Sequence, residues 1–229
     1  MLGALQEFAG LQVDVLAFVI SIALLLGYHA FLRAMLRRHP TYTIQALNSL
    51  ARAAWVESVM AERRDILAVQ TLRNSTMAAS FLASTAVLLI LAVLTLSAQG
   101  DKLGETWHSL NVFGTREPAV WLAKLLMMTV DLFGAFFSFA MAIRVYNHVG
   151  YLINIPAKAD HALVLPSHVA EFLNRGGHYY YLGQRAFYFL VPLVFWLFGP
   201  HFMLLATCGL IVMLYRVDRA PRALQRDFR

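Results

Sequence analysis

The sequence predicts an all-α protein, a polytopic membrane helix bundle that forms a single integral membrane domain over residues 1–229. The first observation is composition: 59% of the residues are hydrophobic and 14% are charged, whereas a soluble domain usually carries about 25% charged residues. The second is that several uncharged stretches are too long for a soluble core. Both observations argue against a water-soluble enzyme.

Three stretches are predicted to cross the membrane completely, at about residues 13–36, 75–98 and 120–144. The first holds 18 residues without a formal charge, which at about 1.5 Å per residue nearly cover a hydrocarbon core of about 30 Å. The second has no charge between residues 76 and 98. Lys124 and Asp131 interrupt the third, which is otherwise apolar.

A fourth apolar run, residues 186–215, contains Pro192 and then Gly199-Pro200. Proline removes a backbone donor and clashes with the preceding turn, so the run is expected to bend or break. It is either a helical hairpin turning at Gly199-Pro200 or one long kinked span. Each hairpin arm would have only about 14 residues, short enough to be re-entrant or shielded by protein.

The distribution of charge favours the hairpin. The segment before the first span holds Glu7 and Asp14. The connector 99–119 has more acidic than basic residues, whereas the connector 33–73 and the tail after Tyr215 are rich in arginine. Basic connectors usually remain in the cytoplasm. The predicted location is thus the bacterial inner (plasma) membrane, with the N-terminus outside and the C-terminus cytoplasmic, and without a cleavable signal peptide.

Amphipathic cytoplasmic helices are expected between the spans. His39-Pro40 should end the first helix, and apolar residues then recur at helical spacing from Thr43 onward. Residues 65–72 should continue as helix into the second span. Pro166-Ser167 can open a short helix through Leu173 that Gly176-Gly177 ends.

No nucleic acid partner, metal or other cofactor is predicted. The net charge of +6 rests on 19 basic residues, of which three are lysines, and in a membrane protein this excess is the usual topology signal. Cys208 is the single cysteine. Of the eight histidines only His29 and His201 lie in apolar runs, without the spacing of a metal site.

Four segments resemble the domain-of-unknown-function family 599 of bacterial and plant membrane proteins. They are residues 52–60 (RAAWVESVM), 67–78 (LAVQTLRNSTMA), 142–156 (AIRVYNHVGYLINIP) and 182–200 (LGQRAFYFLVPLVFWLFGP). The resemblance extends from about Arg33 to Tyr215 and is loose in the outer connector and in 176–181. It implies a multi-span membrane protein and supplies no catalytic residue.

Polar groups at membrane depth are the candidates for a transport path. Asp131 is the strongest, because a carboxylate near the centre of a membrane helix costs about 3 kcal/mol to insert. Lys124 and Ser138 each lie seven residues from it, nearly on the same helix face. His201 is a further candidate at the predicted bend. Alternatively, Asp131 makes a buried structural contact and Lys124 extends to the outer interface.

A second group of polar residues is predicted on the cytoplasmic side. Arginine forks there could hold a phosphate of a lipid headgroup or a nucleotide. They could equally form the ordinary interfacial belt that anchors helices. The candidates for contact with lipid or phosphate are Arg144, His148, Arg175 and Arg185.

The favoured function is a homo-oligomeric channel or transporter-like protein with a polar path near Asp131. The alternative is a membrane scaffold or lipid-binding protein without transport activity, whose partners would be lipids with acidic headgroups. An enzyme ranks last, because no arrangement of nucleophile, base or paired carboxylates is present. Homo-oligomerisation is expected because the small residues 78–80, 83 and 84 give the second span a close-packing face.

Overall fold

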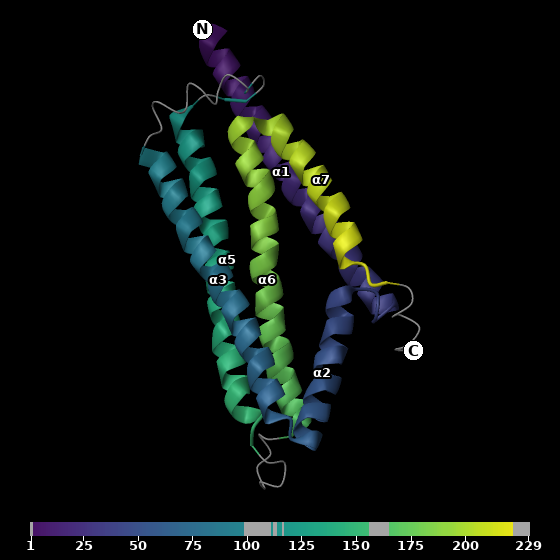
Figure 1. Cartoon of the computed structure of the whole chain (residues 1–229). Helices are drawn as coiled ribbons and strands as arrows, with labels where there is room; N and C mark the ends of the chain where they lie inside the picture. The colour runs from purple at the N-terminus through teal and green to yellow at the C-terminus, as the bar shows by residue number, and fades with distance from the viewer. Residues whose placement is uncertain (1, 99–110, 112–113, 116, 156–164, 222–229) are drawn as a thin grey trace. The chain divides into compact units, whose positions relative to one another are not determined.

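Six α-helices make up most of the computed structural model, which describes residues 2–98, 111, 114–115, 117–155 and 165–221 (Figure 1). They are α1 (Leu2–Arg38), α2 (Ile44–Glu62), α3 (Asp65–Ala98), α5 (Pro118–Leu152), α6 (Pro166–Phe198) and α7 (Pro200–Asp218). These residues contain no strand. The predicted all-α class is confirmed for this part of the chain.

Five of these helices, all except α2, are long and apolar enough to cross a membrane. This indicates a multi-pass membrane protein. The predicted short arms of the last run are wrong, because α6 has 33 residues and α7 has 19. Helix α6 begins at Pro166, where the sequence predicted a short helix to open, and it continues through Leu173 into the apolar run.

The last run is broken between α6 and α7. Gly199 has φ 142°, a conformation that only glycine adopts without steric cost. Pro200 follows as the first residue of α7, a position where its missing N–H leaves no hydrogen bond unmade. The run is therefore two helices and not one kinked helix.

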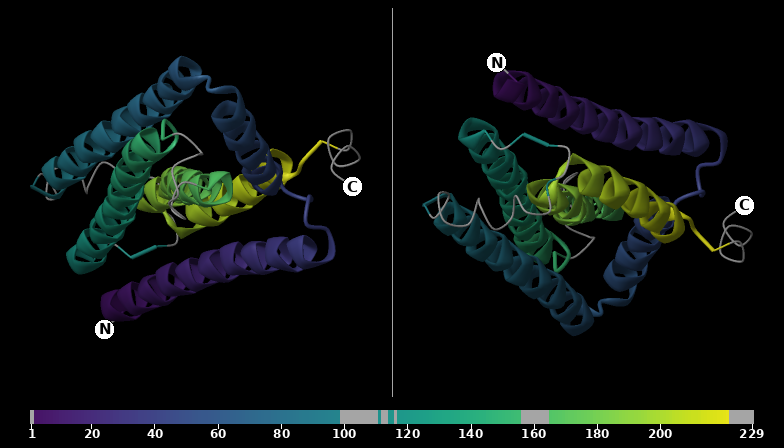
Figure 2. Two further views of the ribbon diagram at one scale, coloured as in Figure 1. Left: turned by 90° about the horizontal axis from the view of Figure 1, so that it is seen from below. Right: turned by 90° about the horizontal axis from the view of Figure 1, so that it is seen from above.

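The described residues cluster into two units, and α3, α5 and α6 each contribute to both. The first unit draws on residues 1–40, 88–133 and 186–219. In it α1 and α7 lie side by side (Figures 1 and 2). Tyr28 and Leu32 of α1 pack with Leu210 and Leu214 of α7, and the Tyr28 hydroxyl donates to Asp218 Oδ2 at 2.6 Å. A second cluster of the same unit includes Leu132.

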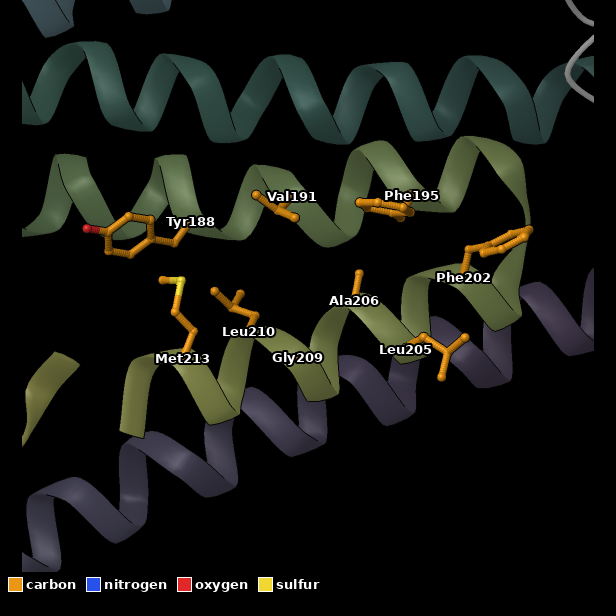
Figure 3. A pocket seen from close by; sticks show the side chains of 9 residues that line it. All are labelled: Tyr188, Val191, Phe195, Phe202, Leu205, Ala206, Gly209, Leu210 and Met213. Carbon is orange, nitrogen blue, oxygen red and sulfur yellow. The ribbon is translucent and has the colours of Figure 1, made fainter. Parts of the chain in front are cut away.

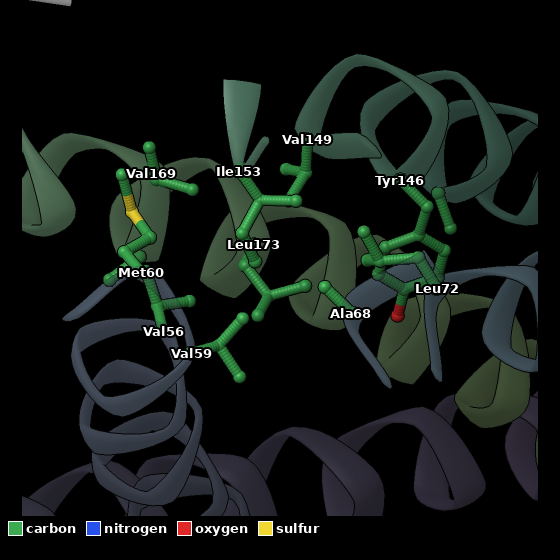
Figure 4. Packing of buried hydrophobic residues seen from close by; sticks show 12 residues of the cluster. Val56, Val59, Met60, Ala68, Leu72, Tyr146, Val149, Ile153, Val169 and Leu173 are labelled. Atoms are coloured by element: carbon green, nitrogen blue, oxygen red, sulfur yellow. The ribbon is translucent and has the colours of Figure 1, made fainter. Parts of the chain in front are cut away.

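The second unit draws on residues 41–87, 134–185 and 220–229. Its core takes side chains from α2, α3, α5 and α6 (Figure 4). Val56 of α2, Val149 of α5 and Val169 of α6 are completely buried in it. Helix α2 begins where the sequence predicted, because the Thr43 hydroxyl accepts a hydrogen bond from the Ala46 N–H at 3.3 Å.

The predicted helix end at Gly176-Gly177 is wrong, because α6 passes through both residues without interruption. A Cβ on Gly176 would lie 2.8 Å from the Tyr146 ring, and one on Gly177 would lie 2.7 Å from Arg52 Cζ. The two glycines therefore allow close packing of side chains against a continuous helix.

Two predictions about the segments that flank α2 are confirmed. The first helix ends at Arg38, and α3 runs without a break from Asp65 into the second span. Most of the predicted outer connector 99–119 lies outside the described residues. The same is true of Lys158 and of the tail arginines Arg222, Arg226 and Arg229.

Candidate functional site

Asp14 is the centre of a buried polar cluster in the first unit. Helix α1 is continuous from Leu2 to Arg38, so Asp14 lies in its interior and not on a flank before the span. Its residue is 0% exposed. A carboxylate in that position requires a partner charge or full hydrogen bonding to remain ionised.

Lys124 of α5 provides the partner charge. Its Nζ lies 2.8 Å from Asp14 Oδ1, and the residue is 3% exposed. The same ammonium group donates to the Trp196 carbonyl oxygen at 3.3 Å and lies 5.1 Å from the centroid of the Trp196 ring. Lys124 is therefore a buried cation that is paired with Asp14.

Two N–H groups complete the binding of the Asp14 carboxylate. Trp196 Nε1 donates to Oδ1 at 2.7 Å, and the backbone N–H of Thr115 donates to Oδ2 at 2.8 Å. The indole ring is held in place by stacking on Phe18, with ring centroids 4.9 Å apart. Both carboxylate oxygens thus accept hydrogen bonds, which satisfies the condition for a stable buried charge.

A short segment before α5 closes over this cluster. The Asn111 side chain accepts from the Gly114 N–H at 2.8 Å and donates to the Thr115 carbonyl at 3.2 Å. A Cβ on Gly10 of α1 would lie 3.0 Å from the Thr115 nitrogen, so glycine permits this approach of the two backbones. The ion pair is therefore enclosed, and the geometry favours a fixed structural charge pair over a group open to solvent.

Asp131 is arranged differently, although it lies only seven residues beyond Lys124 on α5. Its Oδ2 atom is buried and makes no hydrogen bond with the residues that the structure describes. Its residue as a whole is half-buried. Lys124, the nearest cation on the same helix face, is already bound to Asp14. Asp131 is thus the carboxylate whose environment leaves a polar contact to be made.

Ser138 of α5 and His201 of α7 are the other predicted path residues. Ser138 is half-buried and belongs to the second unit. His201 is half-buried in the first turn of α7, where its ring packs against Phe202 with centroids 4.3 Å apart. A Cβ on Gly199 would lie 2.9 Å from the His201 ring, so the histidine sits on the break between α6 and α7.

The groove between the second half of α6 and α7 is apolar (Figure 3). It has a volume of about 540 Å³, and among its lining residues only Tyr188 carries a polar side-chain group. Such a surface suits acyl chains or another apolar helix and gives no route to an ion. A polar path, if one includes Asp131, does not use this groove.

The predicted lipid-contact residues are distributed over two helices of the second unit. Arg144 and His148 of α5 are exposed, and His148 packs edge-on against Phe172 at 5.2 Å. On α6 the exposed Arg175 donates to the Tyr179 hydroxyl at 3.4 Å. Arg185 is 4% exposed.

The two arginines of α6 do not form one phosphate clasp. Arg185 Nε donates to the Tyr181 hydroxyl at 2.7 Å, and its guanidinium lies 4.8 Å from the centroid of that ring. Arg175 and Arg185 are ten positions apart on one helix, about 15 Å along its axis. Each arginine instead contacts a tyrosine of its own helix.

Arg52 of α2 makes polar contacts that the sequence alone did not predict. Its Nε donates to Asn174 Oδ1 at 2.8 Å, while Asn174 Nδ2 donates to the Ser49 carbonyl at 3.2 Å. Burial lowers the pKa of the Arg52 guanidinium, an effect that the neighbouring Tyr146 opposes. These bonds attach α2 to α6 and account for the glycine at 177.

No group of three histidine, cysteine or acidic side chains within the described part of the chain could hold a metal ion. Cys208 is exposed on α7. The polar groups of the described residues include an enclosed ion pair, an incompletely bonded carboxylate and arginine–tyrosine contacts.

Residues 16–223 match the family described as "Protein of unknown function, DUF599". The chain belongs to this family. The match covers nearly the whole sequence and confirms the resemblance found in its four motifs. No curated protein and no solved structure matches the chain. Membership in DUF599 assigns no activity to any residue.

Asp14 is the residue of this DUF599 chain whose role the sequence could have revealed. The predicted topology already places the start of the first span and the start of the third span at the same face of the membrane. Asp14 and Lys124 then lie at similar depths with opposite charge, and such residues usually pair. Its position next to the uncharged stretch makes Asp14 resemble a charge of the flanking segment.

Proposed function

We propose that this DUF599 protein is a homo-oligomeric transporter or channel in which protons or small ions pass along a polar path that includes Asp131. The observation that carries the proposal is the buried Asp131 Oδ2 atom, which has no hydrogen-bond partner in the described residues. An ionisable group in a membrane helix is costly to insert and normally meets water, a ligand or a partner side chain.

The position of Lys124 strengthens the case for Asp131. A buried carboxylate is usually stabilised by a nearby cation, and removing that cation leaves an uncompensated charge. Here Lys124 is bound to Asp14 and to the Trp196 carbonyl, so it is not available to Asp131. The carboxylate can then exchange a proton or bind a cation without first breaking an ion pair.

Oligomerisation would bring a second copy to the Asp131 face. Val130 is 60% exposed and Phe133 is 44% exposed on either side of the carboxylate. Gly134, next to Phe133, is also exposed and leaves room for a close approach. On α3, Ala79 and Ala83 are buried within the second unit, so the expected small-residue face is partly used inside the chain.

The proposed location is the bacterial inner membrane, with the N-terminus outside and the C-terminus in the cytoplasm. The number of candidate spans is five, and an odd number of crossings supports ends on opposite faces. The connector at residues 33–73, which contains α2, is richer in arginine than the connector at residues 99–119. Arginine-rich connectors usually lie on the cytoplasmic side, which supports this orientation. Fusion of a reporter enzyme or fluorescent protein to either end tests this orientation.

The transport activity is tested with purified protein in liposomes, with a pH-sensitive dye for a proton gradient and with sodium- and potassium-sensitive dyes for separate sodium and potassium gradients. We expect the wild-type protein to dissipate at least one gradient and Asp131→Asn to reduce the rate strongly. Glu57→Gln, which changes an exposed carboxylate of α2, is the matched control and should retain the wild-type rate.

Two results would contradict the proposal. Equal rates for the wild type and Asp131→Asn would remove Asp131 from the path. A monodisperse, correctly folded protein that moves none of the ions would instead favour the alternative of a membrane scaffold or lipid-binding protein without transport activity.

A further inference from the structure

A second groove lies wholly within the second unit, between α3 and α5. Its volume is about 600 Å³, and it is lined on the α3 side by residues between Val69 and Met77 and on the α5 side by residues between Tyr146 and Asn154. Unlike the groove between α6 and α7, it is lined by several polar side chains. Its chemistry is therefore that of a site for an amphipathic ligand.

The charge of this groove is positive. Among the described residues that line it, Arg73 is the only charged one and none is a carboxylate. Arg73 is exposed and forms no ion pair with any residue in the described ranges. An exposed guanidinium with no acidic neighbour in the groove is suited to bind a phosphate or carboxylate oxygen through two parallel N–H bonds.

Hydrogen-bonding groups on α5 face the same groove. Asn147 and Tyr151 are exposed and lie one turn apart on that helix. Asn154 is also exposed and uses its Nδ2 to donate to the Gly150 carbonyl at 3.0 Å. The amide of Asn147 and the hydroxyl of Tyr151 are thus donors and acceptors for the glycerol or sugar hydroxyls of a polar headgroup.

The position of Arg73 in the sequence agrees with a headgroup site. It is the last charged residue before the uncharged stretch 76–98 of α3, so it marks the level at which the apolar part of that helix begins. Arginine at this level meets the phosphates of the adjacent leaflet. Met77, one turn further along α3 and 58% exposed, continues the groove with an apolar surface for an acyl chain.

From these observations we infer that the groove between α3 and α5 binds an anionic phospholipid, with its phosphate on Arg73 and its headgroup hydroxyls near Asn147 and Tyr151. The site differs from the arginine–tyrosine pairs of α6, where Arg175 and Arg185 each contact a tyrosine. It does not depend on transport through Asp131, because the groove and Asp131 belong to different units.

Native mass spectrometry of the full chain tests the inference. Delipidated protein in detergent micelles is titrated with phosphatidylglycerol and, separately, with phosphatidylcholine of the same acyl chains. We expect tighter binding of phosphatidylglycerol, and about tenfold weaker binding in Arg73→Gln, the loss that corresponds to one charged hydrogen-bonding contact. Arg73→Lys should retain part of the affinity because it keeps the charge.

Arg33→Gln is the matched control, because Arg33 is an exposed arginine of α1 with no ion pair in the described residues. It should bind phosphatidylglycerol as the wild type does, and all variants should have the wild-type melting temperature. Equal affinity for the two lipids, or equal losses in Arg73→Gln and Arg33→Gln, would overturn the inference. Displacement of the lipid by millimolar inorganic phosphate would also overturn it, in favour of a soluble-anion site.

Discussion

Lys124 Nζ lies 2.8 Å from Asp14 Oδ1, and both residues are almost completely withdrawn from the surface. Removing one member of such a pair leaves an uncompensated charge in an apolar environment. Removing both members of the pair removes that charge as well. The two charges are therefore expected to depend on each other far more than an exposed pair does.

Lys124→Met should lower the free energy of unfolding by about 3–5 kcal/mol, because Asp14 is then buried without a counter-charge. Asp14→Asn should also destabilise the protein, whereas the double variant should be more stable than the sum of the two losses predicts. Unfolding in mixed detergent micelles, followed by tryptophan fluorescence, measures all four proteins. Strict additivity would show that the pair contributes no coupling energy.

Trp196→Phe tests the hydrogen bond between the indole and Asp14. Phenylalanine can still stack on Phe18, but it lacks the N–H that lies 2.7 Å from Asp14 Oδ1. A loss of about 1–3 kcal/mol in the free energy of unfolding is expected, since a buried acceptor loses a donor. Phe195→Leu changes a 43% exposed neighbour and should change stability by less than about 0.5 kcal/mol.

Gly183→Ala tests the packing of α6 against α5 in the second unit. A Cβ at this position would lie 2.7 Å from two carbons of the Phe139 ring, which is completely buried and has little room to move. Overpacking of this kind costs about 1–3 kcal/mol. A thermal melt in detergent should show a clear decrease in Tm.

Gly27→Ala of α1 is the control for that substitution, because Gly27 is exposed and nothing lies within 4 Å of its added Cβ. Alanine is the better helix former by about 1 kcal/mol in a helix interior. The Tm of this variant should therefore be unchanged or higher. If this control lowered Tm as much as Gly183→Ala does, the loss could not be assigned to overpacking against Phe139. It would instead be a general effect of replacing glycine with alanine in these helices.

Tyr28→Phe removes the hydroxyl that links α1 to α7. Asp218, which is 6% exposed, would lose a hydrogen bond of 2.6 Å. The expected loss is about 1–3 kcal/mol, measured by the same unfolding assay. Tyr215→Phe changes an exposed hydroxyl on α7 and should leave stability within about 0.5 kcal/mol of the wild type.

The helical class and most helix starts could be predicted because local signals determine them. Thr43 is a side-chain cap, and Gly199-Pro200 combines a positive φ with a proline that begins a helix. The length of α6 could not be predicted in this way. Gly176-Gly177 has the composition of a helix end, and only the tertiary contacts with Tyr146 and Arg52 explain why the helix continues.

The candidate site was predicted only in part. The cost of a charge at membrane depth is the signal in the sequence that points to Asp131 and Lys124. It could not show which partner each would find, because the partners come from helices far away in the sequence. Asp14 and Trp196 are 182 residues apart, yet they share a hydrogen bond.

The ion pair on α1 has a consequence for biosynthesis. The Thr115 N–H that binds the Asp14 carboxylate follows it by 101 residues, and the indole that binds it follows by 182. A ribosome releases α1 long before either donor, or Lys124, has been made. Until then, the Asp14 carboxylate must be hydrated, contact the insertion machinery or be protonated. The first helix can complete the contacts of its Asp14 only after the last helices have been synthesised.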